Sequence, residues 1–134
     1  MPKLRHSLVI ALVLLGCTKD KPIEPIESPS RNAGSFLLTL TTPNTDDAAL
    51  LFELRGPGIS AIHTLNPSVQ LFADSSGTTI RGALFGPLTV GALVSFDVPD
   101  TTKLADYLAS VLDVVGPGNG LRSSLTGYSL RVAR

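Results

Sequence analysis

Apolar and polar residues alternate along several short segments of the chain, most of them after residue 34. The alternation is clearest in residues 36–41, 49–55 and 93–98. Because successive side chains of a strand point to opposite faces of a sheet, each of these segments predicts a half-buried strand. Weaker segments of the same kind lie between turn-forming residues, at 59–65, 69–73, 78–85 and 128–132. Short strands at this spacing predict an all-β domain, either a sandwich or a barrel.

The same alternation assigns a hydrophobic core. Seven apolar side chains fall on the inward faces: Phe36, Leu38, Leu40, Leu50, Leu54, Val94 and Val98. Phe52, Phe96 and Tyr128 also fall on inward faces, so we expect them in the core rather than on the surface as platforms for a sugar. The outward positions include three carboxylates, which we expect to be solvated: Glu53, Asp97 and Asp113.

Residues 101–115 fit two patterns. Six apolar residues recur at helical spacing, with Asp100 as a candidate N-cap and Gly116-Pro117 as a stop: Leu104, Tyr107, Leu108, Val111, Leu112 and Val115. The alternation of five residues fits a strand equally well: Tyr107, Ala109, Val111, Asp113 and Val115. Because the neighbouring segments are predicted strands and the glycine-rich residues 116–120 suit a hairpin loop, we predict a strand over 107–115, with the helix as the alternative.

The first sixteen residues have the pattern of a secretory signal peptide. Residues 1–7 carry Lys3 and Arg5 and no acid, and residues 8–15 are apolar without a break. A helix that spans a bilayer needs about 20 such residues, so this run is too short to cross it. A basic stretch, a short apolar stretch and a small residue in this order predict a signal peptide over residues 1–16.

The end of this segment resembles the lipobox of bacterial lipoproteins. Its residues are Leu14-Leu15-Gly16-Cys17, and Cys17 is the one cysteine of the chain. The resemblance implies cleavage between Gly16 and Cys17, and lipidation of Cys17 by diacylglyceryl and further acyl groups such as palmitate. Two or three acyl chains anchor a protein stably, so the expected partner is the lipid bilayer. Thr18, in place of aspartate, favours the outer membrane if the host has two membranes.

Residues 17–33 are expected to be the lipidated cysteine followed by a linker. Residues 18–33 contain three prolines and six charged side chains but no aromatic residue. Such a segment cannot bury enough apolar surface to fold. We therefore expect a disordered tether that holds the domain of residues 34–134 away from the membrane.

The order of segments after residue 34 resembles the cohesin-like and carbohydrate-binding-like sandwiches of secreted bacterial proteins. The resemblance rests on residues 42–54, 79–85 and 91–99. It implies one β-sandwich of about 7–9 strands, of the jelly-roll or immunoglobulin-like type, over residues 34–134. It does not define a binding partner.

The residue inventory offers little for catalysis or metal binding. His63 is the one histidine after residue 17, and no Gly-x-Ser-x-Gly motif supports a Ser60–His63 pair, so we expect His63 at the surface of an edge strand. Three residues with side-chain oxygens near residue 45 lack a calcium-loop spacing and are expected to form a solvated turn: Asn44, Asp46 and Asp47. Residues 116–120 lack the spacing of a dinucleotide-binding loop. We expect no catalytic residue, no metal and no cofactor.

Charge argues against a nucleic-acid partner. The chain has eleven basic and eleven acidic residues and no charged run, whereas a nucleic-acid binder shows a basic patch. The sequence therefore predicts a non-enzymatic lipoprotein of the cell envelope, whose β-sandwich binds or scaffolds a partner, with the choice between a protein and a glycan left open. The alternative is a carbohydrate-binding or adhesion module at the cell surface.

Overall fold

The computed structural model describes residues 31–134 and contains eight strands. The strands are β1 Gly34–Thr41, β2 Asp47–Arg55, β3 Ser60–Thr64, β4 Gln70–Ser76, β5 Thr79–Leu88, β6 Gly91–Val98, β7 Leu108–Val115 and β8 Ser129–Ala133. Two single 3₁₀ turns, η1 Leu104–Asp106 and η2 Pro117–Asn119, precede and follow β7. The expectations for the signal peptide, for Gly16 and Cys17, and for the linker up to residue 30 lie outside the described residues.

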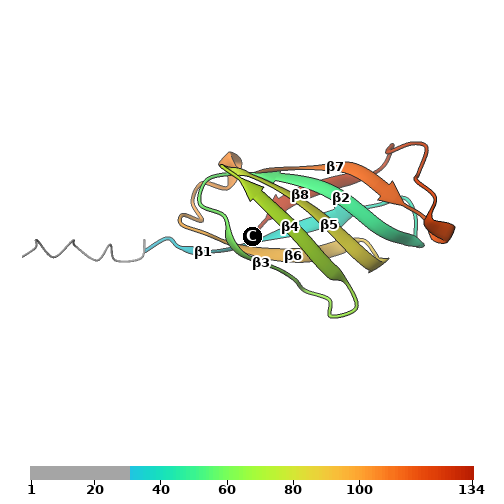
Figure 1. Ribbon diagram of the computed structural model, residues 1–134. Coiled ribbons are helices and arrows are strands. Elements are labelled where there is room, and N and C mark those ends of the chain that lie inside the picture. The colour runs from blue at the N-terminus through green and yellow to red at the C-terminus, as the bar shows by residue number, and fades with distance from the viewer. Residues whose placement is uncertain (1–30) are drawn as a thin grey trace, which may run out of the picture.

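The strands form two four-stranded antiparallel sheets, which confirms the predicted single β-sandwich (Figure 1). The β1 sheet has the order β3-β6-β1-β8, and the β2 sheet has the order β4-β5-β2-β7. The hairpin β4–β5 joins two neighbours of one sheet, and the other connections cross from one sheet to the other. Within residues 31–134, no helix is long and apolar enough to span a bilayer.

The core lies between the sheets and contains the side chains that alternation assigned to it on β1, β2 and β6, whereas Tyr128 is only partly buried against it. The inward residues of β1, β2 and β6 are all buried: Phe36, Leu38, Leu40, Leu50, Phe52, Leu54, Val94, Phe96 and Val98. Phe52 comes from the β2 sheet and Phe96 from the β1 sheet, and both belong to one cluster. The ring of Phe36 packs edge-on against those of Tyr107 and Phe96, with centroids 5.2 and 6.1 Å away. The expected common core is therefore confirmed.

Glycine at position 82 is required by this packing. A Cβ at Gly82 would lie 2.3 Å from the ring of Phe52, so the phenyl group covers the glycine backbone on the neighbouring strand. No larger residue fits there unless Phe52 moves, which ties β5 closely to β2.

The ambiguous segment is a strand, because β7 pairs with β2 along its length. The helical interpretation is wrong except for the single turn η1, since a helix would leave this edge of β2 unpaired. The predicted alternation fails near its end, where the register shifts and Leu112 is the extra residue between the partners of Phe52 and Leu51. The shift reverses the faces, so that Val114 rather than Val115 is fully buried.

Two turns differ from the expected ones. The turn predicted at residues 74–77 is shorter, because β4 continues to Ser76 and only Gly77 and Thr78 connect it to β5. Gly77 has a φ of 61°, which glycine adopts without steric cost. The loop over residues 116–120 reverses the chain locally, but β8 then pairs with β1 in the other sheet. It is therefore not the loop of a β7–β8 hairpin.

Candidate functional site

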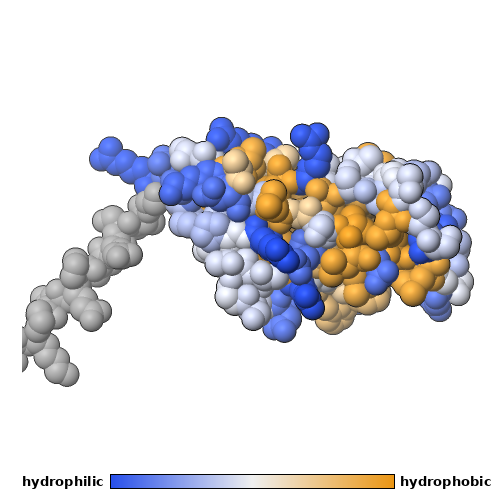
Figure 2. All heavy atoms as spheres, turned by 90° about the horizontal axis from the view of Figure 1, so that it is seen from above, coloured by the Kyte–Doolittle hydropathy of each residue, from blue (hydrophilic) through white to orange (hydrophobic). Residues whose placement is uncertain are grey.

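An apolar stripe crosses the outer face of the β2 sheet. We define it by five residues that share this face: Leu51, Phe72, Ala83, Phe85 and Leu112. Phe72 of β4 lies beside Ala83 of β5, and Ala83 lies beside Leu51 of β2. Leu112 continues the row on β7, next to the residue that pairs with Leu51. Figure 2 shows apolar side chains gathered over the upper side of the molecule, where this sheet lies.

The apolar stripe is exposed and hollowed. The exposed fractions of Phe72, Phe85, Leu112 and Leu51 are 61, 45, 40 and 38%. A shallow groove of about 430 Å³ runs over its centre and includes Leu51, Phe72 and Leu112 in its lining. Single exposed apolar residues need no explanation, but a contiguous set bordered by charge is typical of an interaction surface. Within residues 31–134, the stripe is therefore the candidate binding site.

The two phenylalanine rings of the stripe form a corner rather than a platform. The centroids of Phe72 and Phe85 lie 5.8 Å apart, and the ring planes meet at 76°. Edge-to-face contact is a preferred geometry of aromatic pairs, so each ring holds the other in place. A flat ligand can stack on one ring but not on both at once.

A charged row lies beside the apolar stripe on the same face, made of Glu53, Arg55, Asp74 and Arg81. Asp74 pairs with Arg81 in the strand register, and Arg81 pairs with Glu53. Both arginines form ion pairs with the Glu53 carboxylate, and the Arg81 Nε–Oε2 distance is 3.3 Å. In Figure 2 strongly hydrophilic side chains run beside the apolar ones. The two arginine side chains remain mostly exposed and border the stripe with charge.

Glu53 is a correction to the sequence analysis, because it points outward as expected but is buried rather than solvated. The side chains of Arg55 and Arg81 cover it. Burial raises the pKa of the Glu53 carboxyl, but hydrogen bonds and charge from the two arginines outweigh it, so the pKa lies below its usual value. Glu53 therefore acts as the fixed acceptor that orients both arginines.

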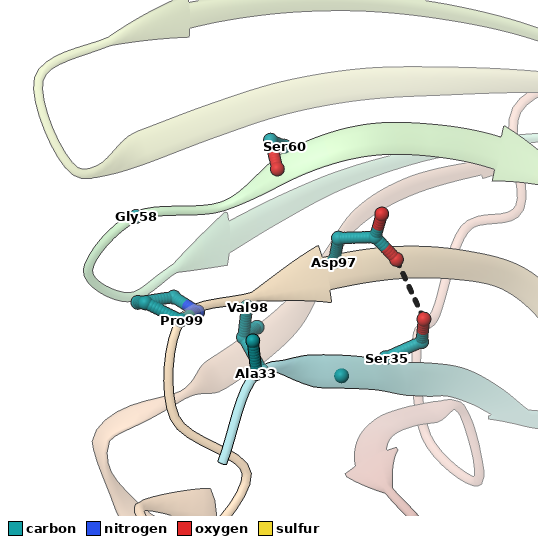
Figure 3. A pocket seen from close by; sticks show the side chains of 8 residues that line it. Ala33, Ser35, Gly58, Ser60, Asp97, Val98 and Pro99 are labelled. Carbon is teal, nitrogen blue, oxygen red and sulfur yellow. Dashed lines mark hydrogen bonds between the residues drawn. The ribbon is translucent and has the colours of Figure 1, made fainter. Parts of the chain in front are cut away.

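A second hollow, with a volume of about 550 Å³, lies where β1 and β3 begin and β6 ends (Figure 3). Ser35, Ser60 and Asp97 contribute its polar side chains, and the Ser35 hydroxyl donates a 2.6 Å hydrogen bond to the Asp97 carboxylate. Its other lining residues are small or apolar, and none carries a basic side chain. The lining therefore contains no histidine or lysine to pair with a serine as in Ser–His and Ser–Lys nucleophiles.

His63 lies at the surface of the edge strand β3, as expected. Its ring Nδ1 is 2.9 Å from the carbonyl oxygen of Ala61 in its own strand. The strand register places Ser60 beside Asp97 and His63 beside Ser95, and a register shift separates the two pairs. The structure thus brings Ser60 to a carboxylate, and His63 does not line the hollow that contains them.

The acids of the β1–β2 connection do not form the expected solvated turn, because Asp47 is buried. Its Oδ2 accepts a 2.6 Å hydrogen bond from Thr42. Its Oδ1 accepts hydrogen bonds from the hydroxyl of Tyr128 at 2.7 Å and from Nη2 and Nε of Arg122 at 2.9 and 3.1 Å. Asp46, at the surface, pairs with the same guanidinium. Local sequence did not reveal this burial, because Arg122 and Tyr128, which donate to Oδ1, lie more than 70 residues away along the chain.

This buried carboxylate is a structural pin rather than a metal site. The guanidinium of Arg122 already supplies the positive charge that a cation would bring, and Asn44 donates its amide to Tyr128 at 2.6 Å. Within residues 31–134, no group of three histidine, cysteine or acidic side chains is placed to hold a metal ion. The cluster fastens the start of β2 to the segment before β8.

Comparisons with protein-family models, with curated proteins and with solved structures found no match for this chain. The class that the structure itself defines is an eight-stranded antiparallel β-sandwich with an exposed apolar stripe on one face.

The apolar stripe was not among the sites predicted from the sequence, although the sequence carries a signal for it. Alternation places Val69 and Leu71 on the inner face, which leaves Phe72 on the outer face. The same logic turns Phe85 outward beside the buried Leu84. A large aromatic residue at an outward position of a strand is the feature to search for.

Proposed function

We propose that this protein is a non-catalytic lipoprotein of the cell envelope whose β-sandwich binds a partner protein through the apolar stripe. The observation that carries the proposal is the exposure of the stripe, where two phenylalanine and two leucine side chains remain 38–61% exposed on one sheet face. Leaving this area in water is unfavourable, and covering it with an apolar surface contributes about 25 cal/mol per Å². The exposed arginines beside the stripe supply orientation rather than most of the affinity.

The anchor in this proposal is Cys17. A basic start, an apolar run and Leu14-Leu15-Gly16-Cys17 precede the rest of the chain, and the chain has one cysteine, at this place. Acyl chains on Cys17 attach the protein to the bilayer, and residues 18–33 act as the tether. In a host with two membranes, Thr18 favours the outer one.

A carbohydrate is the second candidate ligand, favoured by the exposed rings of Phe72 and Phe85. Sugars stack on flat aromatic surfaces, but these rings meet at 76° and the rest of the stripe is aliphatic. The geometry therefore favours a partner with apolar side chains that fit the corner. Binding of the domain to a glycan array, and loss of that binding in the Phe72→Ala variant, would support the carbohydrate instead.

We expect the stripe to be covered in intact cells. To test this, intact cells that express the full chain are treated with hydroxyl radicals. Oxidation of Leu112 and Phe85 is then measured by mass spectrometry. The change Leu51→Glu places a charge at the centre of the stripe, where the side chain is exposed and the core is undisturbed. Leu51→Glu should raise the oxidation of Leu112 and Phe85 several-fold, because the bound partner dissociates and no longer shields them.

Leu121 is the internal control, since it is an exposed leucine outside the stripe, at 67%. Its oxidation should be equal in both chains. Leu65→Glu is the matched variant, because it adds the same charge at an exposed leucine away from the stripe, and it should change nothing. Equal oxidation of Leu112 and Phe85 in the original chain and in Leu51→Glu would contradict the proposed binding surface.

A further inference from the structure

The free edge of β4 is a second feature of the β2 sheet, distinct from its outer face. β4 is the first strand in the sheet order, so one side of its backbone has no neighbouring strand (Figure 1). Seven consecutive residues, Gln70–Ser76, pair with β5 without any register shift. The strand contains no proline or lysine, and its one charged side chain is Asp74. A long, regular edge with a single charge is a template for another strand.

The other three edge strands are protected. In β3 the register is broken, and Ala61 has a φ of 47°, which bends the edge away from a regular ladder. The end of β7 is covered, since Leu121 bridges to Val115 and the Arg122 N–H donates to the Val114 carbonyl at 2.8 Å. β8 is five residues long and carries Arg131. Among the described residues, β4 is therefore the edge strand with the longest ladder that has no register shift.

The hairpin geometry shows which backbone groups of β4 are available. Gly77 and Thr78 form a two-residue loop, so Ser76 and Thr79 close the hairpin as a hydrogen-bonded pair. Alternation along an antiparallel ladder then directs the backbone groups of Phe72 and Asp74 toward β5. The N–H and C=O groups of Leu71, Ala73 and Ser75 point away from β5, toward the free edge.

We propose that β4 pairs antiparallel with β4 of a second copy, about a two-fold axis at Phe72. In this register Leu71 of each copy exchanges backbone hydrogen bonds with Ala73 of the other. The two Phe72 side chains face each other as a non-hydrogen-bonded pair, the closer kind, and an aromatic cross-strand pair stabilises a ladder. The two-fold makes the contact closed, so it yields a dimer and not a fibre.

The charge along β4 is compatible with pairing to a second copy in this register. With the axis at Phe72, each Asp74 lies opposite the uncharged Gln70 of the other copy. An axis at Asp74 would place two carboxylates directly opposite each other, which destabilises a ladder. The symmetric pairing also joins the two apolar stripes at Phe72, so that one stripe crosses eight strands. The dimer does not depend on the lipid anchor, and it leaves Leu112 at the far edge of each stripe free for a partner.

A disulfide tests both the dimer and its register. The full chain carrying Cys17→Ser has no other thiol, so Phe72→Cys introduces one, and mild oxidation is followed by non-reducing electrophoresis. Directly opposite Cα atoms of a non-hydrogen-bonded pair lie about 4.5 Å apart, within the range for a disulfide. Most of the Phe72→Cys chain should form a covalent dimer.

Gln70→Cys is the matched control, because Gln70 is exposed on the same strand and the same face. In the proposed register its two copies are four residues apart, so it should stay monomeric on oxidation. The mass of the otherwise unchanged chain, measured by sedimentation equilibrium, should be that of a dimer. Ala73→Lys should halve it, since a charge on an exposed edge position blocks pairing, while Thr78→Lys at the hairpin tip should not.

A monomeric mass for the unchanged chain would overturn the dimer. Equal disulfide formation by Phe72→Cys and Gln70→Cys would also overturn it, because it would indicate random collision. A covalent dimer captured through Ala73→Cys instead of Phe72→Cys would overturn the register.

Discussion

Replacing Phe96 with alanine should lower the free energy of unfolding by about 3–5 kcal/mol. Phe96 is fully buried, and its ring packs against those of Phe36 and Tyr107 with both centroids 6.1 Å away. The change leaves a cavity between the two sheets that neither sheet can close alone. Since a domain of this size has about 5–15 kcal/mol of stability, the variant should be marginal or unfolded. Chemical denaturation followed by far-ultraviolet circular dichroism measures this loss.

Phe52→Ala should cost a similar amount, because Phe52 fills the same core from the opposite sheet and covers Gly82. Asp97→Ala is the control, one residue from Phe96 but on the outer face, where it accepts one exposed hydrogen bond from Ser35. It should cost no more than about 1 kcal/mol. A larger loss for Asp97→Ala than for Phe96→Ala would mean that the faces of β6 are reversed.

Asp47→Ala should be the most damaging change of a charged residue, at about 3–5 kcal/mol. It removes the acceptor of Thr42, Tyr128 and Arg122 at once and leaves the guanidinium without its buried partner. Asp46→Ala is the matched control, since it removes a carboxylate from the same guanidinium but at the surface. An exposed ion pair contributes about 0–1 kcal/mol, so the two losses should differ clearly. Equal losses would contradict the role of Asp47 as the pin.

The same carboxylate should make stability depend on pH. Burial raises the Asp47 pKa. Hydrogen bonds from Thr42, Tyr128 and Arg122, together with the charge of Arg122, lower it by more, so the folded-state pKa lies below the usual value. The unfolded chain therefore takes up the proton first, as pH falls through about 3.9. The stabilisation is complete above that pH and is lost as pH falls toward the folded-state pKa. The melting temperature of Asp47→Asn should fall less steeply below pH 4 than that of the unchanged chain.

Alternation predicted the strands and their faces where they pair without interruption. Phe36, Leu38 and Leu40 are buried on β1, as expected from period two. It failed after Leu112, because a bulge is fixed by the register with β2 and not by the sequence of β7 itself. The partner strand lies more than 50 residues away in the chain, so no local pattern carries that information.

The charged residues show the same limit. Glu53 was predicted to be exposed from its outward position on a strand, and Asp47 from its position in a turn, yet both are buried. Glu53 is covered by Arg81, and Asp47 is reached by Arg122, which is 75 residues distant. Burial of these carboxylates depends on an arginine from a distant part of the chain, Arg81 of β5 for Glu53 and Arg122 of the β7–β8 connection for Asp47, and the fold decides which segments meet. The sequence alone predicted the sandwich but not which segments meet in it.

Metabolic labelling with a clickable fatty acid tests the proposed anchoring of this sandwich to a membrane through Cys17. The full chain and its Cys17→Ser variant are expressed in a bacterial host, purified and compared for incorporated label at equal protein amounts. The chain has no other cysteine, so the account predicts label in the original chain and none in Cys17→Ser. Equal labelling of the two chains, or no label in either, would contradict it.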